Sequence, residues 1–208
     1  MRPGRFGDSR ARRIGLLGGS FNPAHAGHLH VARMALRALR LDQLWLMVSP
    51  GNPLKPVAGM APLGERLASA RRLEEGGRII ATDIERSLGT RYTADTLRLL
   101  RRRFRRARFV FVIGADNLCQ LPRWKGWRRI ARGTTLAVLP RPGFTRRALA
   151  GQAAAALRRH RRAPGALLAE RFAPHAAWCL VPAREHAASA TAIRAARAGS
   201  DTGERRGP

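Results

Sequence analysis

Cysteine, acidic residues and long apolar runs are scarce in this sequence of 208 residues, and each shortage excludes a class of protein. The two cysteines, Cys119 and Cys179, are too few for a disulfide framework or for a zinc ribbon. Because so few thiols are typical of a protein from a reducing compartment, we expect a cytoplasmic location.

No apolar run is long enough to cross a membrane. The longest runs lie near residues 44–48 and 109–113, whereas a membrane helix needs about 20 apolar residues. Residues 1–13 are rich in arginine and glycine and lack the apolar segment of a secretory signal. The sequence therefore predicts neither a membrane protein nor a secreted one. Its 45% of hydrophobic residues is enough for a substantial core.

The shortage of acidic residues leaves a strongly basic chain. Asp and Glu number 13 against 40 Lys and Arg, which gives a formal net charge of +27, and only Lys55 and Lys125 are lysines. One interpretation is a nucleic-acid-binding protein held by phosphate contacts. The other is a general use of arginine together with a phosphate-rich substrate. Aromatic residues make up only 6% and do not alternate with the arginines, so we expect no specific nucleic-acid partner.

Short apolar runs alternate with helical periodicities along the chain. We expect strands at residues 13–19, 42–49, 78–81, 108–113, 134–139 and 176–181, and helices at 27–39, 62–75, 93–104, 145–162 and 189–198. This alternation predicts an α/β protein with a single doubly wound, mostly parallel sheet and helices on both faces. We expect a disordered leader at residues 1–12, one domain at 13–198 and a flexible tail at 199–208.

The first expected strand runs into a loop rich in glycine and histidine, Gly18-Gly19-Ser20-Phe21-Asn22-Pro23-Ala24-His25-Ala26-Gly27-His28. Paired glycines let the backbone approach a ligand closely. His25 and His28 come where a helix begins, beside free N–H groups and the positive end of the helix dipole. Such donors suit a phosphoryl group under in-line attack. A P-loop is excluded, because the sequence has no Gly-Lys pair.

The two histidines have simpler interpretations as well. They could be ordinary helix caps, or they could bind a metal together with His30. No nearby cysteine or carboxylate completes a metal shell, so we predict no metal bound by the protein itself.

The whole loop resembles the H-x-G-H signature of a nucleotidyltransferase superfamily. Residues 189–194 (SATAIR) resemble its second signature, Ile-Ser-Ser-Thr-x-Ile-Arg, with Ala188 and Ala190 in place of the usual Ile and Ser. Further segments resemble the bacterial nicotinate-nucleotide adenylyltransferase family: residues 91–97 (RYTADTL), 113–118 (IGADNL) with 121–124 (LPRW), and 141–143 (RPG). The matches span residues 13–195 in the same order.

The resemblance implies a Rossmann-like nucleotidyltransferase fold and a specific reaction. ATP would donate AMP to nicotinate mononucleotide, giving deamido-NAD and pyrophosphate, with Mg²⁺ carried by ATP. The alternatives are a sister enzyme, such as a pantetheine-phosphate adenylyltransferase, and a basic nucleic-acid-binding α/β protein. The oligomeric state stays open, a homo-oligomer being one option.

The resemblance also assigns an ATP site, formed by Gly18, Gly19, Ser20, Phe21, His25, His28, Gly114, Asp116, Ser189, Thr191 and Arg194. His25 and His28 would hold the α- and β-phosphates. Asp116 would take ribose hydroxyls, or it could cap the helix that follows. Ser189, Thr191 and Arg194 would hold the β- and γ-phosphates, with one hydroxyl contact missing because of the alanine at position 190.

A second set of residues is assigned to nicotinate mononucleotide, namely Asn52, Lys55, Tyr92, Thr93, Trp124 and Arg141. Trp124 would stack on the pyridine ring, or it could belong to the core. Thr93 and its neighbouring amide would meet the nicotinate carboxylate, or Thr93 could cap a helix. Lys55 and Arg141 would reach phosphates, or they could be ordinary solvated side chains. Lys125 would add to the preference for a carboxylate if it turns inward.

Overall fold

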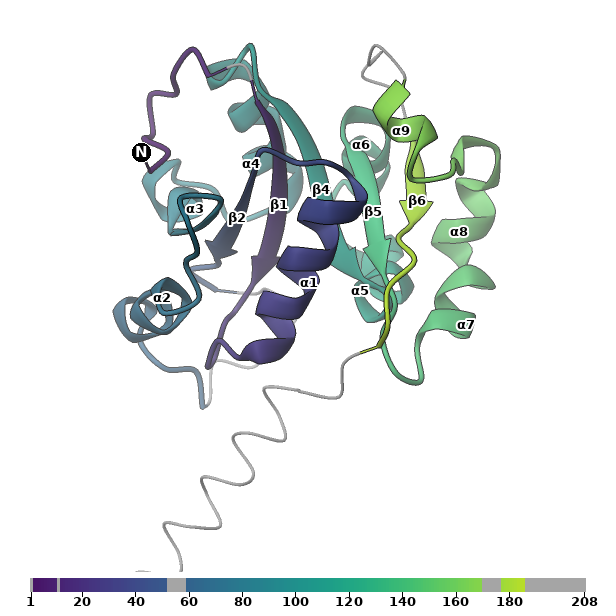
Figure 1. The fold of residues 1–208 in the computed structure, drawn as a ribbon, viewed down its shortest axis with the longest axis horizontal. Helices are drawn as coiled ribbons and strands as arrows, with labels where there is room; N and C mark the ends of the chain where they lie inside the picture. Colours follow the sequence, from purple (N-terminus) through teal and green to yellow (C-terminus); the bar gives the residue numbers. More distant parts are fainter. Residues whose placement is uncertain (1, 11, 52–58, 170–176, 186–208) are drawn as a thin grey trace, which may run out of the picture.

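The structure, a computed structural model, describes residues 2–10, 12–51, 59–169 and 177–185. It contains one six-stranded sheet in the order β3-β2-β1-β4-β5-β6, in which every neighbouring pair is parallel (Figure 1). The strands are β1 (Arg13–Gly19), β2 (Gln43–Val48), β3 (Ile79–Thr82), β4 (Arg108–Gly114), β5 (Thr135–Leu139) and β6 (Trp178–Leu180). The predicted α/β fold with a doubly wound parallel sheet is confirmed.

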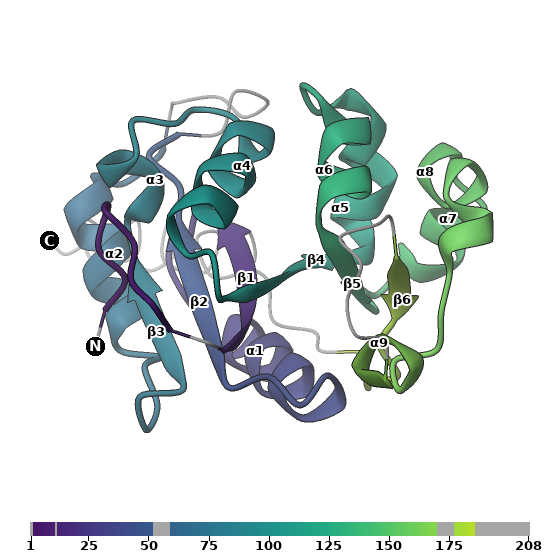
Figure 2. The same ribbon diagram turned by 90° about the horizontal axis from the view of Figure 1, so that it is seen from above.

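Helices cover both faces of the sheet, as the view from above shows (Figure 2). They are α1 (Ala26–Ala38), α2 (Leu63–Arg71), α3 (Ile84–Ser87), α4 (Thr93–Arg103), α5 (Ala115–Gln120), α6 (Trp127–Gly133), α7 (Thr145–Leu149), α8 (Gln152–Ala156) and α9 (Ala166–Ala169), with 3₁₀ turns η1 (Leu121–Arg123) and η2 (Arg158–His160). No helix in the described ranges is long and apolar enough to span a bilayer.

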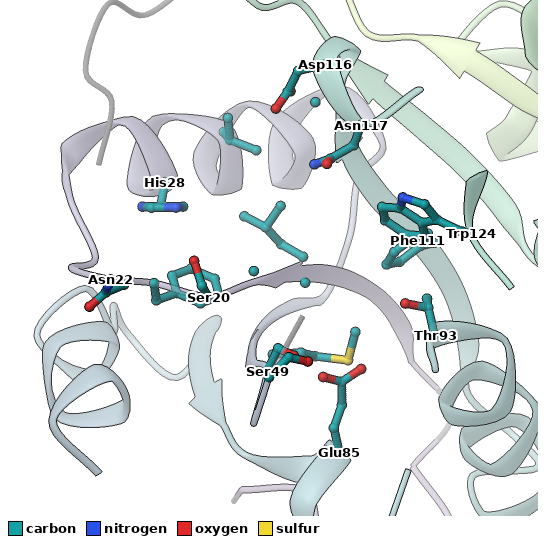
Figure 3. A pocket seen from close by; sticks show the side chains of 18 of the residues that line it. Ser20, Asn22, His28, Ser49, Glu85, Thr93, Phe111, Asp116, Asn117 and Trp124 are labelled. Carbon is teal, nitrogen blue, oxygen red and sulfur yellow. The ribbon is translucent and has the colours of Figure 1, made fainter. Parts of the chain in front are cut away.

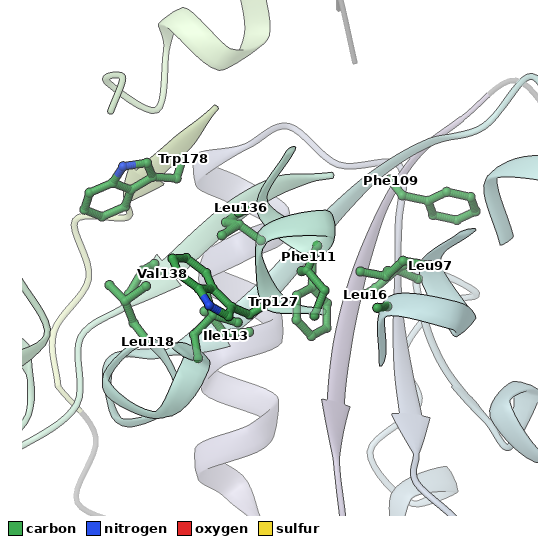
Figure 4. Packing of buried hydrophobic residues seen from close by; sticks show 14 of the residues in the cluster. Leu16, Leu97, Phe109, Phe111, Ile113, Leu118, Trp127, Leu136, Val138 and Trp178 are labelled. Atoms are coloured by element: carbon green, nitrogen blue, oxygen red, sulfur yellow. The ribbon is translucent and has the colours of Figure 1, made fainter. Parts of the chain in front are cut away.

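Each face of the sheet has its own hydrophobic cluster, because side chains alternate along a strand. Leu16 packs into a cluster with α3 to α8, whereas its neighbour Leu17 packs into a second cluster with α1, α2 and α9. Figure 4 shows the first cluster, where Phe111 of β4 lies between Leu16 and Trp127. The apolar runs of the central strands therefore reflect burial on both faces.

Residues 145–162 do not form the single helix that their composition predicts. Helix α7 ends at Leu149 and α8 begins at Gln152, with Gly151 between them in an extended conformation of φ −80° and ψ 168°. Glycine has a low helix propensity, and here it begins a new helix. The surrounding run of alanine and arginine hides this break. The expected helix at residues 189–198 and the tail at 199–208 lie outside the described residues.

Residues 2–10, which belong to the segment expected to be a disordered leader, contact the domain. The side chain of Arg10 is only 11% exposed and donates to Gln43 and to Asp8. It also lies over the rings of Trp45 and Phe104, at 5.5 and 5.8 Å from their centroids. A basic segment without apolar periodicity can thus be held by cation–π contacts and ion pairs. The domain boundary at residue 13 stays a prediction.

The order of the strands determines where a ligand can bind. Chain connections leave β1 in one direction along the sheet and β4 in the other, so the two adjacent strands form a topological switch point. In open parallel sheets, ligands bind at the carboxyl ends of the strands at such a point. The loops after Gly19 and Gly114 therefore lie at the expected edge.

Candidate functional site

A cavity of about 510 Å³ opens at the carboxyl ends of β1, β2 and β4. Its lining joins the loop after β1 to residues from α3, α4, α5 and the segment that follows η1 (Figure 3). Its histidine end is formed by Gly18, Gly19, Ser20, His25 and His28, and its tryptophan end by Tyr92, Thr93, Trp124 and Lys125. The described residues of both assigned sets thus line the same cavity.

The histidines cap the helix that follows them and also line the cavity. His25 is the N-cap of α1, and its Nδ1 accepts from the Gly27 N–H at 3.1 Å. The Nδ1 of His28 accepts from the His25 N–H at 3.2 Å. The two rings lie 3.9 Å apart between centroids. The capping interpretation is therefore confirmed, and it does not compete with a role in the cavity.

The caps determine what the imidazoles can offer to a ligand. A neutral ring whose Nδ1 accepts a hydrogen bond carries its proton on Nε2. His25 and His28 are therefore both Nε2–H donors when neutral. Two such donors beside the start of α1 form a site suited to an oxyanion. His30 lies outside the cavity lining, with its Nε2 3.0 Å from the Arg184 carbonyl.

A metal site made by the protein alone is not found in the described part of the chain. No group of three or more His, Cys, Asp or Glu side chains there could hold an ion. The interpretation of His25, His28 and His30 as a set of metal ligands therefore lacks support.

The carboxyl end of β4 contributes a glycine and a carboxylate. Asp116 is the second residue of α5, whose N-cap is Gly114, so the prediction that Asp116 caps this helix is wrong. A Cβ at position 114 would lie 2.3 Å from Oδ1 of Asp116, so a larger residue there would require the carboxylate to turn away. This buried Oδ1 accepts no hydrogen bond from the described residues, although Nε of Arg141 lies 3.5 Å away. Asp116 forms an ion pair with Arg141, and both residues line the cavity.

The tryptophan end is built from the start of α4 and the segment after η1. Tyr92 is the N-cap of α4 and Thr93 is its first residue, so the prediction that Thr93 caps the helix is wrong. Trp124 packs against the core and also lines the cavity, with its ring 6.2 Å from that of Phe111. Lys125 is exposed, but its Nζ lies 4.5 Å from the Tyr92 ring centroid, and both residues line the cavity.

Glu85 of α3 is a cavity residue that sequence reasoning missed. Its carboxylate accepts from the Thr96 hydroxyl at 3.2 Å. Burial raises the pKa of Glu85, and hydrogen bonds from Thr96 and Ser49 oppose the shift. Figure 3 shows Glu85 beside Ser49, between the two ends of the cavity. No local signal in the sequence distinguishes this glutamate from a surface residue.

Several assigned residues cannot be located in the structure. Asn52, Lys55, Ser189, Thr191 and Arg194 lie outside the described residues. Gly18, Gly19, Ser20, Phe21, His25, His28, Tyr92, Thr93, Gly114, Asp116, Trp124 and Arg141 all line the one cavity.

Comparison with known proteins identifies the family of the chain. A family model described as cytidylyltransferase-like matches residues 16–196. A protein of Gluconobacter oxydans named probable nicotinate-nucleotide adenylyltransferase is 60% identical over 185 residues, which cover 88% of this chain and 93% of that one. A protein of the same name from Gluconacetobacter diazotrophicus is 58% identical over 191 residues, which cover 91% and 88% of the two chains.

A solved structure extends the comparison to the fold. The nicotinic acid mononucleotide adenylyltransferase of Plasmodium falciparum, complexed with NaAD, superposes with a TM-score of 0.63. The match covers 88% of this chain and 83% of that one. At 15% identity it bears on the architecture alone, and it supports the Rossmann-like nucleotidyltransferase fold.

Proposed function

The chain belongs to the nicotinate-nucleotide adenylyltransferases of the cytidylyltransferase-like family, and from this premise we propose that it transfers AMP from ATP to nicotinate mononucleotide. The products are deamido-NAD and pyrophosphate. The observation that carries the proposal is the pair of histidines that line the cavity at the end of β1 and whose Nδ1 atoms accept hydrogen bonds from backbone N–H groups.

In the proposed step, a phosphate oxygen of nicotinate mononucleotide attacks the α-phosphorus of ATP. The new O–P bond forms as the bond from the α-phosphorus to the bridging oxygen breaks, and pyrophosphate leaves with the electron pair. His25 and His28 donate to the phosphates as negative charge moves to the leaving group. Gly18, Gly19 and Ser20 allow the nucleotide to lie close to the backbone.

The remaining described residues receive roles that fit their positions. Asp116 accepts from ATP ribose hydroxyls, and Arg141, its ion-pair partner, holds the phosphate of the mononucleotide. Trp124 stacks on the pyridine ring, while Thr93 and its backbone amide meet the nicotinate carboxylate. The ring of Tyr92 lies at the same end of the cavity, in contact with the Lys125 ammonium.

Mg²⁺ enters this reaction as part of the substrate. Magnesium is commonly held by substrate phosphates together with only one or two carboxylates. Asp116 and Glu85 are carboxylates of the cavity, and the first has an oxygen with no hydrogen-bond partner among the described residues. We propose that the ion arrives bound to the phosphates of ATP, and that the reaction takes place in the cytoplasm.

The roles assigned outside the described residues remain part of the proposal. Asn52 and Lys55 would contribute to binding of the mononucleotide, and Ser189, Thr191 and Arg194 to binding of the β- and γ-phosphates. They rest on the resemblance of the motifs alone.

A panel of acceptors tests the reaction. Purified protein is incubated with magnesium and ATP, together with nicotinate mononucleotide, phosphopantetheine or no acceptor, and products are separated by chromatography. We expect deamido-NAD and an equal amount of pyrophosphate only with nicotinate mononucleotide. Turnover with phosphopantetheine instead would favour a sister transferase, and turnover with neither acceptor would contradict the proposal.

A further inference from the structure

Arg66 of α2 is buried although no carboxylate lies within ion-pair distance of it in the described part of the chain. It is only 3% exposed, which is rare for arginine without an acidic partner. Its guanidinium donates instead to backbone carbonyls, namely those of Ala61 (2.8 Å), Ser20 (2.8 Å), Ser49 (2.7 Å) and Pro50 (3.2 Å). Burial lowers the pKa of Arg66. Burial of this cation therefore costs desolvation free energy, which suggests that its hydrogen bonds have a functional role.

The bonded carbonyls belong to the edge of the sheet where the cavity opens. Ser20 follows β1, and Ser49 follows the adjacent strand β2. Both serines line the cavity, as Figure 3 shows. The guanidinium is rigid and planar, so it fixes the relative position of the groups that it bonds. The Arg66 side chain of α2 thus links the carboxyl ends of β1 and β2 through hydrogen bonds to the carbonyls of Ser20 and Ser49.

The backbone between Ser20 and Ala24 needs such support. Phe21 is buried and has φ +48°, a left-handed conformation that non-glycine residues avoid. Strain of this kind persists only where the surroundings hold the chain. Arg66 binds the carbonyl just before Phe21, and the Ser69 hydroxyl accepts from the N–H of Ala24, three residues after Phe21, at 2.7 Å. Arg66 and Ser69 lie three residues apart, on one face of α2.

The bond to Ser20 also orients a donor. The carbonyl and the N–H of a trans peptide point in opposite directions. With the Ser20 carbonyl directed at Arg66, the N–H of Phe21 points away from α2. Phe21 lines the cavity, and N–H groups aligned in a loop bind anions.

We propose that Arg66 is a positioning residue for phosphate binding, which holds the Ser20–Phe21 peptide and the backbone of Ser49 and Pro50 in the geometry that receives the phosphates of ATP. The inference rests on the proposed function, since it names the support of that site. Arg66 acts through the backbone of Ser20 and Ser49 and touches no substrate.

The test compares Arg66→Lys with the control Arg10→Lys. Arg10 is also largely buried, but it lies outside the cavity lining. Lysine keeps the charge but cannot reproduce the planar fork of four bonds. Turnover is measured at a temperature where circular dichroism shows every variant folded, and binding of inorganic pyrophosphate is measured by calorimetry. We expect Arg66→Lys to lower kcat by about 10²-fold, the scale of a misplacement near 1 Å.

Pyrophosphate binding should weaken about tenfold in Arg66→Lys, the equivalent of one lost hydrogen bond. The KM for nicotinate mononucleotide should change little, because Arg66 makes no contact with the tryptophan end. General loosening of the fold would instead change both ends together. Arg10→Lys should match the wild type in kcat and in pyrophosphate affinity.

A folded Arg66→Lys variant that matches Arg10→Lys in kcat and in pyrophosphate affinity would overturn the inference. If Arg66→Lys does not fold, Ser69→Ala replaces it in the test, because this substitution removes the hydrogen bond that holds the backbone after Phe21, at Ala24. A pyrophosphate affinity of Ser69→Ala equal to that of the wild type would then overturn the inference. If the wild-type protein fails to turn over nicotinate mononucleotide, only the proposed function is contradicted. The pyrophosphate affinities of the variants still test the role of Arg66.

Discussion

The two ends of the cavity are built by different means. At the histidine end, helix caps and backbone bonds hold the functional groups, so that His25 and His28 are oriented by N–H groups of their own loop. At the tryptophan end, the groups are the tips of side chains, such as Lys125 over the ring of Tyr92. The comparison teaches that the histidine side chains are oriented by nearby backbone N–H groups, whereas the tryptophan end includes side-chain contacts, such as that of Lys125 with Tyr92, that single substitutions can change.

The largest expected effect tests the histidine end. His28→Ala removes one donor to the charge that develops on the leaving group, so we expect kcat to fall about 10²–10³-fold. The KM for ATP should change far less, because the donor acts mainly in the transition state. Steady-state kinetics of the folded variant provide the measurement. His30→Ala, on the same helix but outside the cavity lining, is the control; equal kcat values for the two variants would contradict the assignment.

The next effect tests whether side chains at the tryptophan end select the acceptor. Trp124 contacts the face of a pyridine ring and cannot distinguish a carboxylate from an amide. Donors near Thr93 and the Lys125 ammonium satisfy a carboxylate but are left unpaired by an NH₂ group. We expect kcat/KM for nicotinate mononucleotide to exceed that for the nicotinamide form by at least about 10²-fold. Lys125→Met should reduce this ratio, and equal kcat/KM for the two acceptors in the wild type would contradict the prediction.

A smaller effect concerns Asp116, which lies between the two ends. Gly114→Ala places a Cβ 2.3 Å from the present position of Oδ1, so the carboxylate must turn away. We expect ATP to bind about tenfold more weakly, as for the loss of one hydrogen bond, in a protein that still folds. Calorimetric titration with ATP measures the change. Gly64→Ala in α2 is the control, since its Cβ would meet nothing within 4 Å. Equal ATP affinity in both variants would argue against a ribose contact by Asp116.

The smallest effect concerns Glu85 and depends on pH. Its folded-state pKa is raised by burial, so ionisation at neutral pH opposes folding, whereas below the unfolded-state pKa the carboxyl is protonated in both states and this cost disappears. Glu85→Gln removes the cost and keeps an acceptor for the Thr96 hydroxyl. We expect its Tm at pH 7.5 to exceed that of the wild type by about 2–4 °C, with a smaller difference at pH 4.5. Thermal unfolding at both pH values tests this, and a difference that grows in acid would contradict it.

Much of this architecture could be predicted from local patterns. The strand at residues 13–19 has the predicted bounds, because its apolar run has no competing periodicity. The loop from Gly18 to His28 identified the histidine end, since its glycines and histidines act within one turn of each other. The short helices α3 and α6 were not predicted, because four to seven residues carry too little periodicity, and the helix at α5 was expected only from the possible cap at Asp116.

The sequence by itself determined the alternation of strands and helices and the histidine pair at the end of the first strand, because both depend on neighbours a few residues apart. Only the tertiary structure decided that Arg66 lies beneath Ser20 and Ser49, that Glu85 faces the cavity, and that Lys125 turns toward Tyr92. These contacts join separate turns and strands, and the parallel pairing of β1 with β2 and β4 brings such segments to one edge. A side chain's burial and partners depend on that packing, which no local pattern of residue types encodes.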